Sequence, residues 1–145
     1  MQTTIAAALL FASSAYAVCT DAPRPVVNWN YCVMEQRRDL SGQKLDNAGI
    51  RQTRLIMVNM ERADLRKVNF EGANLGFGRF VKANAQAANF TNATLYGADF
   101  TDADLREATF DKVDMATVRL KGADLTGAKW SDGRVCGPIS IGVCR

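Results

Sequence analysis

The feature that most constrains the fold is a spacing of five residues between large apolar side chains. Between Ala88 and Phe110 these side chains are Phe90, Leu95, Phe100, Leu105 and Phe110. Five residues turn an α-helix by about 140° beyond a full turn, so they cannot form one helical stripe. An odd period also sends successive residues to opposite faces of a flat strand. The chain must therefore turn after every unit, so that each large residue points at a common axis.

The same spacing continues through most of the sequence without an insertion. Nineteen positions run in steps of five from Leu40 to Trp130, and only Ala85 among them is small. Two residues before each position the chain usually carries alanine or valine. Because side chains two apart on an extended segment share a face, both residues of a unit can point inward. Glycines such as Gly72 and Gly97 suit the corner that must follow each large residue.

These units resemble the pentapeptide-repeat family. The family motif, A-(D/N)-L-x-x, is present as ADLRK, ANLGF, ADFTD, ADLRE and ADLTG. The resemblance covers Leu40 to about Asp132 and implies an all-β fold, a right-handed quadrilateral β-helix with four units per coil and about five coils. Residues twenty apart then stack in columns. One column is predicted to form an aromatic ladder: Ile50, Phe70, Phe90, Phe110 and Trp130.

The sequence divides into four segments around this repeat. We predict a signal peptide at residues 1–17, an N-terminal cap at 18–39, the β-helix at 40–132 and a C-terminal cap at 133–145. Trp29 and Met34 look like the large residues of two irregular first units. Six residues separate Met34 from Leu40, so one residue must bulge. Caps are needed because an open coil exposes unpaired strand edges.

The first segment predicts export. A short apolar run from Ile5 to Ala12 precedes Ala15-Tyr16-Ala17, which fits signal-peptidase cleavage after Ala17. The run is shorter than the roughly 20 residues that a membrane span needs, and no later stretch is long enough. A periplasmic or secreted protein without a membrane span is therefore expected.

Four cysteines flank the repeat, two on each side: Cys19, Cys32, Cys136 and Cys144. An even number in an exported chain favours disulfides, and similar cysteine-bearing ends are found in exported members of the family that this chain resembles. Four cysteines allow three pairings, of which proximity in the sequence favours Cys19–Cys32 and Cys136–Cys144. The chain has no histidine and no closely spaced cysteine pair, so we expect no metal site.

The composition argues against an enzyme. Without histidine there is no Ser-His-Asp triad, and no glycine-rich phosphate loop is present, so we expect no catalytic residues and no cofactor. The net charge is +3 with acids and bases interleaved, which gives no basic run for nucleic acid. Gyrase protection by mimicry of DNA, a role that the family resemblance suggests, needs a strongly acidic surface that this chain lacks.

One outward surface of the predicted coil is apolar. Ile56, Met57, Phe77 and Tyr96 all follow the column of Leu55, Leu75, Leu95 and Met115. Adjacent exposed apolar groups often mark an interface, so we predict contact with an unidentified protein partner or with a second copy. Two alternatives remain open here: a terminal segment folded over this surface, or scattered surface hydrophobes without a role.

The sequence therefore predicts a non-enzymatic exported scaffold that presents a rigid surface to another protein. The alternative function is a module that binds a small ligand or glycan. It would use outward polar rows such as Asn69, Asn89 and Thr91.

Overall fold

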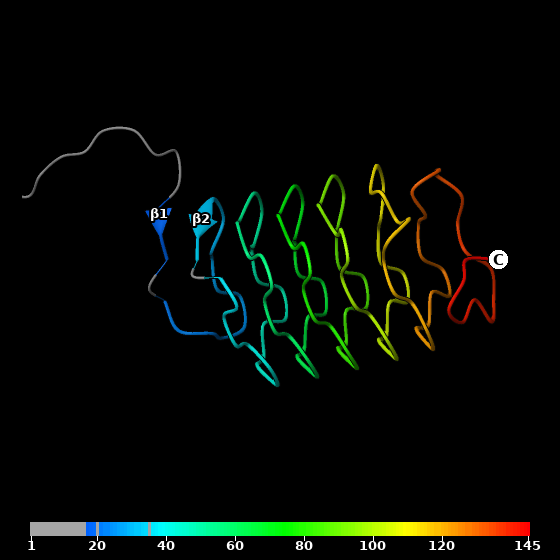
Figure 1. Cartoon of the computed structure of the whole chain (residues 1–145). Coiled ribbons are helices and arrows are strands. Elements are labelled where there is room, and N and C mark those ends of the chain that lie inside the picture. The colour runs from blue at the N-terminus through cyan, green and yellow to red at the C-terminus, as the bar shows by residue number, and fades with distance from the viewer. Residues whose placement is uncertain (1–16, 20, 35) are drawn as a thin grey trace, which may run out of the picture.

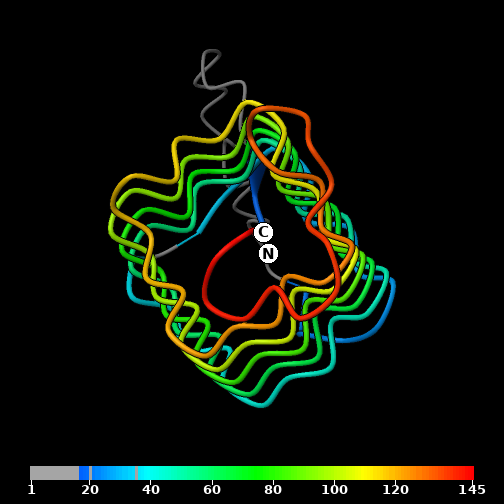
Figure 2. The ribbon, with the colours of Figure 1, turned by 90° about the vertical axis from the view of Figure 1, so that its right-hand side faces the viewer.

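The computed structural model describes residues 17–19, 21–34 and 36–145, which form a right-handed quadrilateral β-helix. The coils stack along one axis (Figure 1), and their outline seen end-on has four sides (Figure 2). Two short strands, β1 (Ala17–Val18) and β2 (Cys32–Val33), pair in parallel, and single parallel bridges join the coils that follow. The all-β prediction is therefore confirmed. The expected signal peptide lies outside the described residues, apart from Ala17.

The register between coils follows the sequence period. From Asp39–Asn59 to Thr109–Lys129, each parallel bridge joins residues twenty apart, so four units make one coil. Only Asn28–Gly49 and Val33–Arg54 are twenty-one apart among the parallel bridges. The extra residue thus falls between Val33 and Asp39, where the spacing of Met34 and Leu40 requires a bulge.

The corners are tight turns, and the corner from Phe70 to Ala73 shows the two kinds of hydrogen bond that hold them. The amide of Ala73 donates to the carbonyl of Phe70 at 2.9 Å, and Gly72 between them has a φ of 66°. A positive φ at the second central residue is the requirement of a type II turn. Asn69 Oδ1 accepts a hydrogen bond from the amide of Glu71 at 3.1 Å. The family's preference for Asn or Asp before the large residue is explained by this contact.

The interior is filled by stacked aromatic rings. Phe90 lies 5.0 Å from Phe70 and 5.2 Å from Phe110, with ring planes 9° and 1° apart. On the opposite side of the coil, Phe80 and Phe100 stack at 4.5 Å. The two columns meet edge to face, as Phe80 and Phe90 do at 6.4 Å and 86°. Both geometries are favourable for aromatic pairs, and the predicted ladder is confirmed over these rings.

The ladder ends differently at its two tryptophans. Trp29 is fully buried. Its amide donates to the carbonyl of Gly49 at 2.7 Å, which places Trp29 next to Ile50 in the column. Trp130 is only partly buried, and it meets Phe110 at 63° instead of stacking. Met115 is likewise only partly buried. The expectation of a continuous stack through Trp130 is therefore wrong, because no further coil follows to cover the last rings.

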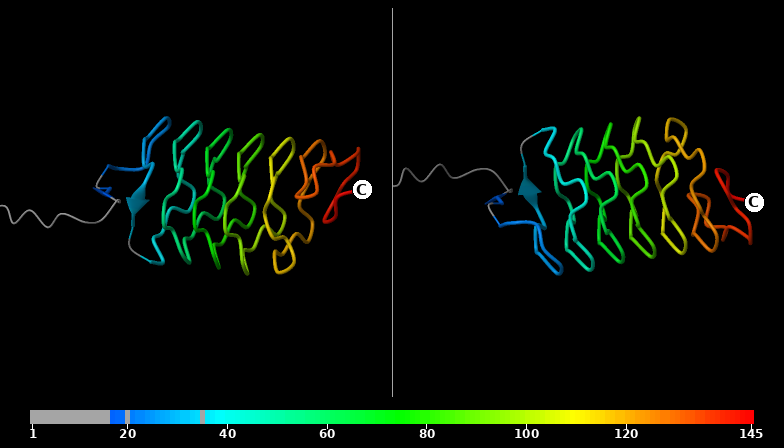
Figure 3. Two further views of the ribbon diagram at one scale, coloured as in Figure 1. Left: turned by 90° about the horizontal axis from the view of Figure 1, so that it is seen from above. Right: turned by 90° about the horizontal axis from the view of Figure 1, so that it is seen from below.

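The two ends of the coil are held by disulfides. Cys19 is joined to Cys32, and Cys136 to Cys144. After Trp130 the chain reverses and pairs antiparallel with the last coil, at Lys129–Val135 and Asp124–Ile141. Figure 2 shows the final residues, in red, crossing the end of the interior, and Figure 3 shows them closing one end of the stack. This reversal gives hydrogen-bond partners to part of the last coil's edge.

Candidate functional site

The surface outside the column of Leu55, Leu75, Leu95 and Met115 carries the predicted interaction residues, and we call it the apolar face. Met57, Phe77 and Tyr96 are 38%, 54% and 57% exposed, and Ile56 is half-buried. Within the part of the chain that the structure describes, no terminal segment covers Phe77 or Tyr96. Among these residues nothing supports the alternative of a terminal segment folded over the face, and the side chains of Phe77 and Tyr96 are open to solvent.

Phe77 and Tyr96 form an aromatic pair on adjacent coils. Their ring centroids are 5.3 Å apart at 84°, and the amide of Phe77 donates to the carbonyl of Tyr96 at 2.8 Å. A side-chain Cβ at Gly97 would lie 2.7 Å from Phe77 Cδ1, so glycine at this position makes room for the Phe77 ring. The sequence predicted both rings on one face, but not this contact, because they occupy different positions in their units.

The backbone beneath Phe77 is strained. Its φ is 57°, and Met57 occupies the equivalent corner of the preceding coil with a φ of 59°. Left-handed backbone costs a residue with a Cβ roughly 1–2 kcal/mol, and glycine or asparagine tolerates it better. Large apolar residues at two successive corners thus gain little for the fold itself.

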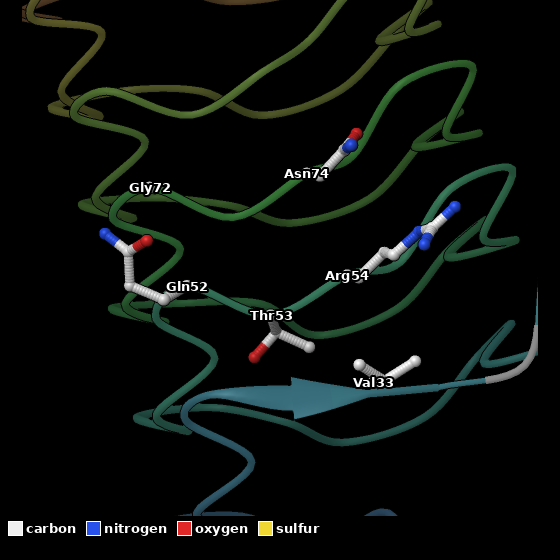
Figure 4. A pocket seen from close by; sticks show the side chains of 6 residues that line it. All are labelled: Val33, Gln52, Thr53, Arg54, Gly72 and Asn74. Carbon is white, nitrogen blue, oxygen red and sulfur yellow. The ribbon is translucent and has the colours of Figure 1, made fainter. Parts of the chain in front are cut away.

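Two hollows lie at opposite ends of the apolar face. The first, of about 340 Å³, is shown in Figure 4, and Arg54 and Asn74 rise from adjacent coils along its lining. Its lining residues are Val33, Gln52, Thr53, Arg54, Gly72 and Asn74. The second hollow, of about 290 Å³, is lined by Asn92, Ala93, Thr94, Leu95, Tyr96, Lys112 and Asp114.

The second hollow coincides with an opening between two coils. The amides of Leu55 and Leu75 donate to the next coil, at Asn74 and Thr94. Among the described residues, the amide of Leu95 donates no corresponding bond to the carbonyl of Asp114. The amide of Gly97 donates to Thr117 Oγ1 at 2.9 Å and not to the carbonyl of Ala116, which would be the equivalent of the Phe77–Tyr96 bond. This departure could not be predicted from the sequence, since the five-residue period continues unchanged through Met115.

The polar rows of the alternative function are already hydrogen-bonded to one another. Asn89 Nδ2 donates to Asn69 Oδ1 at 3.3 Å, and Asn89 Oδ1 accepts from the amide of Thr91 at 3.0 Å. These asparagine side chains close corners and link coils. That structural use leaves them fewer free donors and acceptors for a ligand.

The carboxylates are arranged as hydrogen-bond acceptors. The side-chain hydrogen bond from Arg66 lowers the pKa of Asp64. Burial raises the pKa of Asp104, but hydrogen bonds from Arg106 and Gln86 outweigh it, and the net pKa is lowered. A general acid needs a pKa near the working pH, and a lowered carboxyl pKa does not provide it. Within the described residues, no three Cys, Asp or Glu side chains gather in a way that would hold a metal ion.

The C-terminal cap carries exposed aliphatic residues that the sequence interpretation missed. Val135, Ile139, Ile141 and Val143 are exposed, whereas Cys136, Ser140 and Cys144 are buried. The alternation in ISIGVC was the signal, because it turns the residues between the buried ones outward. No helix among the described residues is both long and apolar enough to cross a membrane.

Known proteins share both the sequence motif and this architecture. Residues 44–76, 79–116 and 98–129 match the family described as pentapeptide repeats, in eight copies. No curated protein matches the sequence. Among solved structures, the pentapeptide repeat protein Rfr23 of the cyanobacterium Cyanothece 51142 is similar, with 32% identity and a TM-score of 0.59. That likeness covers 64% of this chain and 61% of Rfr23, so this chain spans less than two thirds of that protein.

Two further structures are similar at lower identity. A pentapeptide repeat protein of the Arabidopsis thaliana thylakoid lumen has 22% identity and a TM-score of 0.41, over 69% of this chain and 70% of that one. QnrB1, a plasmid-mediated fluoroquinolone resistance protein, has 18% identity and a TM-score of 0.48, over 70% and 66%. The repeat match extends over more than half of the sequence and agrees with the four-sided coil. The chain therefore belongs to the pentapeptide-repeat family.

Proposed function

We propose that this protein is a non-enzymatic scaffold that binds another protein through the apolar face. The observation that carries the proposal is the exposed aromatic pair of Phe77 and Tyr96, with both rings more than half exposed. Aromatic residues are enriched at the centres of protein interfaces, where their large apolar area is buried on binding.

We further propose that the protein works after export, in the periplasm or outside the cell. The apolar run and the Ala15-Tyr16-Ala17 site support this, and disulfides typically persist in oxidising compartments. Amino-terminal sequencing of the protein from its host is expected to begin at Val18. A mature protein that keeps residues 1–17 in the cytoplasm would contradict export.

The binding proposal is tested by placing charges on the face. Phe77→Glu with Tyr96→Glu is expected to remove complexes that chemical cross-linking recovers from the native host, because two carboxylates would have to be desolvated. The matched control is Lys67→Glu with Lys82→Glu, at two corners of other faces with φ near that of Phe77. If the first pair keeps the complexes while remaining folded, the apolar face is not the binding surface.

A further inference from the structure

We propose that the apolar face binds a second copy of this chain, with the two β-helices antiparallel and face to face. The inference rests on the proposed function, since it names the partner of that same face. What points to a second copy is the order of charges and of large and small residues along the face.

The geometry of such a pair fixes which residues meet. A two-fold axis lies in the interface and runs across the coils, so each outward column meets the same column of the other copy in reverse order. The column before the large residues reads Arg54, Asn74, Thr94 and Asp114. Arg54 therefore lies opposite the partner's Asp114, and Asn74 lies opposite the partner's Thr94.

The two charges of this column are suited to that contact. Arg54 and Asp114 are both exposed, and neither forms a salt bridge within residues 17–19, 21–34 and 36–145. Elsewhere, charges pair within the coil, as Arg66 does with Asp64 at 2.6 Å. In a parallel pair, residues of the same coil would meet, and Arg54 would lie three coils away from the partner's Asp114, so the charges favour the antiparallel arrangement.

The sizes of the remaining residues are also complementary in reverse order. One column reads Ile56, Gly76, Tyr96 and Ala116, and the next reads Met57, Phe77, Gly97 and Thr117. Tyr96 thus lies opposite the partner's Gly76, and Phe77 opposite the partner's Gly97. Because the two-fold axis passes between the coils that carry Phe77 and Tyr96, the Phe77–Tyr96 pairs of both copies gather at the centre of the interface. Ile56, Met57 and Tyr96 thus each meet a smaller residue, which suits close packing. Gly97 is already covered by the Phe77 ring of its own copy, so the two Phe77 rings meet each other beside the axis.

The size of the face limits the strength of the dimer. Four coils at about 4.8 Å give a contact only about 15–20 Å long. Because the contact is so short, the area that it buries is expected to fall below the roughly 800 Å² per partner of standard stable interfaces, so a weak and reversible dimer is expected. Screening by salt should weaken it further, because the charge pairs lie at the rim.

Sedimentation of the purified protein with its disulfides intact, from about 5 to 500 µM, tests the pairing. The wild type is expected to show a reversible monomer–dimer equilibrium. Arg54→Asp and Asp114→Arg should each weaken the dimer at least about tenfold, by placing like charges opposite each other. The double swap should bring the dissociation constant back to within about threefold of wild type. As a matched control, Arg62→Asp with Asp102→Arg, two exposed corners of another face, should leave it unchanged.

The outcomes separate this inference from the proposed function. A wild type that stays monomeric throughout overturns the dimer, whereas loss of host complexes in the Phe77→Glu, Tyr96→Glu protein would still support binding to another protein. A dimer that is indifferent to both charge variants uses a different surface and overturns the inference. Single swaps that weaken the dimer without rescue in the double swap overturn the antiparallel register.

Discussion

Single residues show where the repeat serves folding and where it serves something else. Asn69 and Asn89 sit where the motif calls for Asn or Asp, and each closes a turn by accepting an amide hydrogen bond. Phe77 closes no turn with its side chain, and its exposed ring stands at a corner position where the other faces carry polar residues, glycine or alanine. The first kind of residue follows from the period, and the second departs from it. Departures of this kind, on a fold so regular, are the best sequence signal of a binding surface.

Phe77→Asn measures how much the ring contributes to the fold. Asparagine tolerates the left-handed corner, which relieves roughly 1–2 kcal/mol of strain. The loss of the ring contact with Tyr96 costs about 0.5–1.5 kcal/mol. The two effects oppose each other, so urea unfolding should give a free energy within about 1 kcal/mol of wild type. A loss of more than about 3 kcal/mol would show that Phe77 is needed for stability.

At the scale of elements, the coil could be predicted from the sequence and the ends could not. Residues twenty apart pair as the period requires, and even the bulge before Leu40 follows from counting. The antiparallel return of the chain at Val135 and Ile141 was not predictable, because the cap has no repeat to set its register. Partial exposure of Met115 and Trp130 follows from the same end effect. The repeat specifies neighbours for each unit, but nothing in it specifies what lies beyond the last one.

Ion pairs along the coil predict how its stability responds to acid. Hydrogen bonding from Arg66 lowers the pKa of Asp64 in the folded chain below the unfolded value of about 3.9, and Asp104 beside Arg106 is lowered as well. A lowered folded pKa stabilises the fold above the unfolded pKa, and this contribution is lost as pH falls through the folded pKa.

Unfolding midpoints in urea at about pH 7 and about pH 2 check this sign. Wild type should lose stability below about pH 4, and Asp64→Asn with Asp104→Asn should lose less over that interval. Arg66→Gln, which removes the donor but keeps the carboxylate, should likewise reduce the loss of stability between these two pH values. An identical loss of stability in all three proteins would mean that these ion pairs do not lower the pKa values of Asp64 and Asp104.

The whole molecule is a stiff rod whose columns run the full length of the coil. Residues spaced twenty positions apart form a straight row on the surface, so a partner can contact several coils at once. The candidate site could be predicted as a row because of this geometry. The contact of Phe77 with Tyr96 and the opening beside Asp114 required the structure, since both arise from side-chain direction and from the free edge of the last coil.

Whether the apolar face is an interface in the cell is measured most directly by site-specific photo-cross-linking in the native host. A photoreactive phenylalanine analogue placed at Phe77 should trap a defined protein, either a partner or a second copy, as one discrete band. The same analogue at Lys82, a corner of another face with the same φ of 57°, should trap none. Equal products from both positions, or no product from position 77 in a folded and exported protein, would contradict an interface at this face.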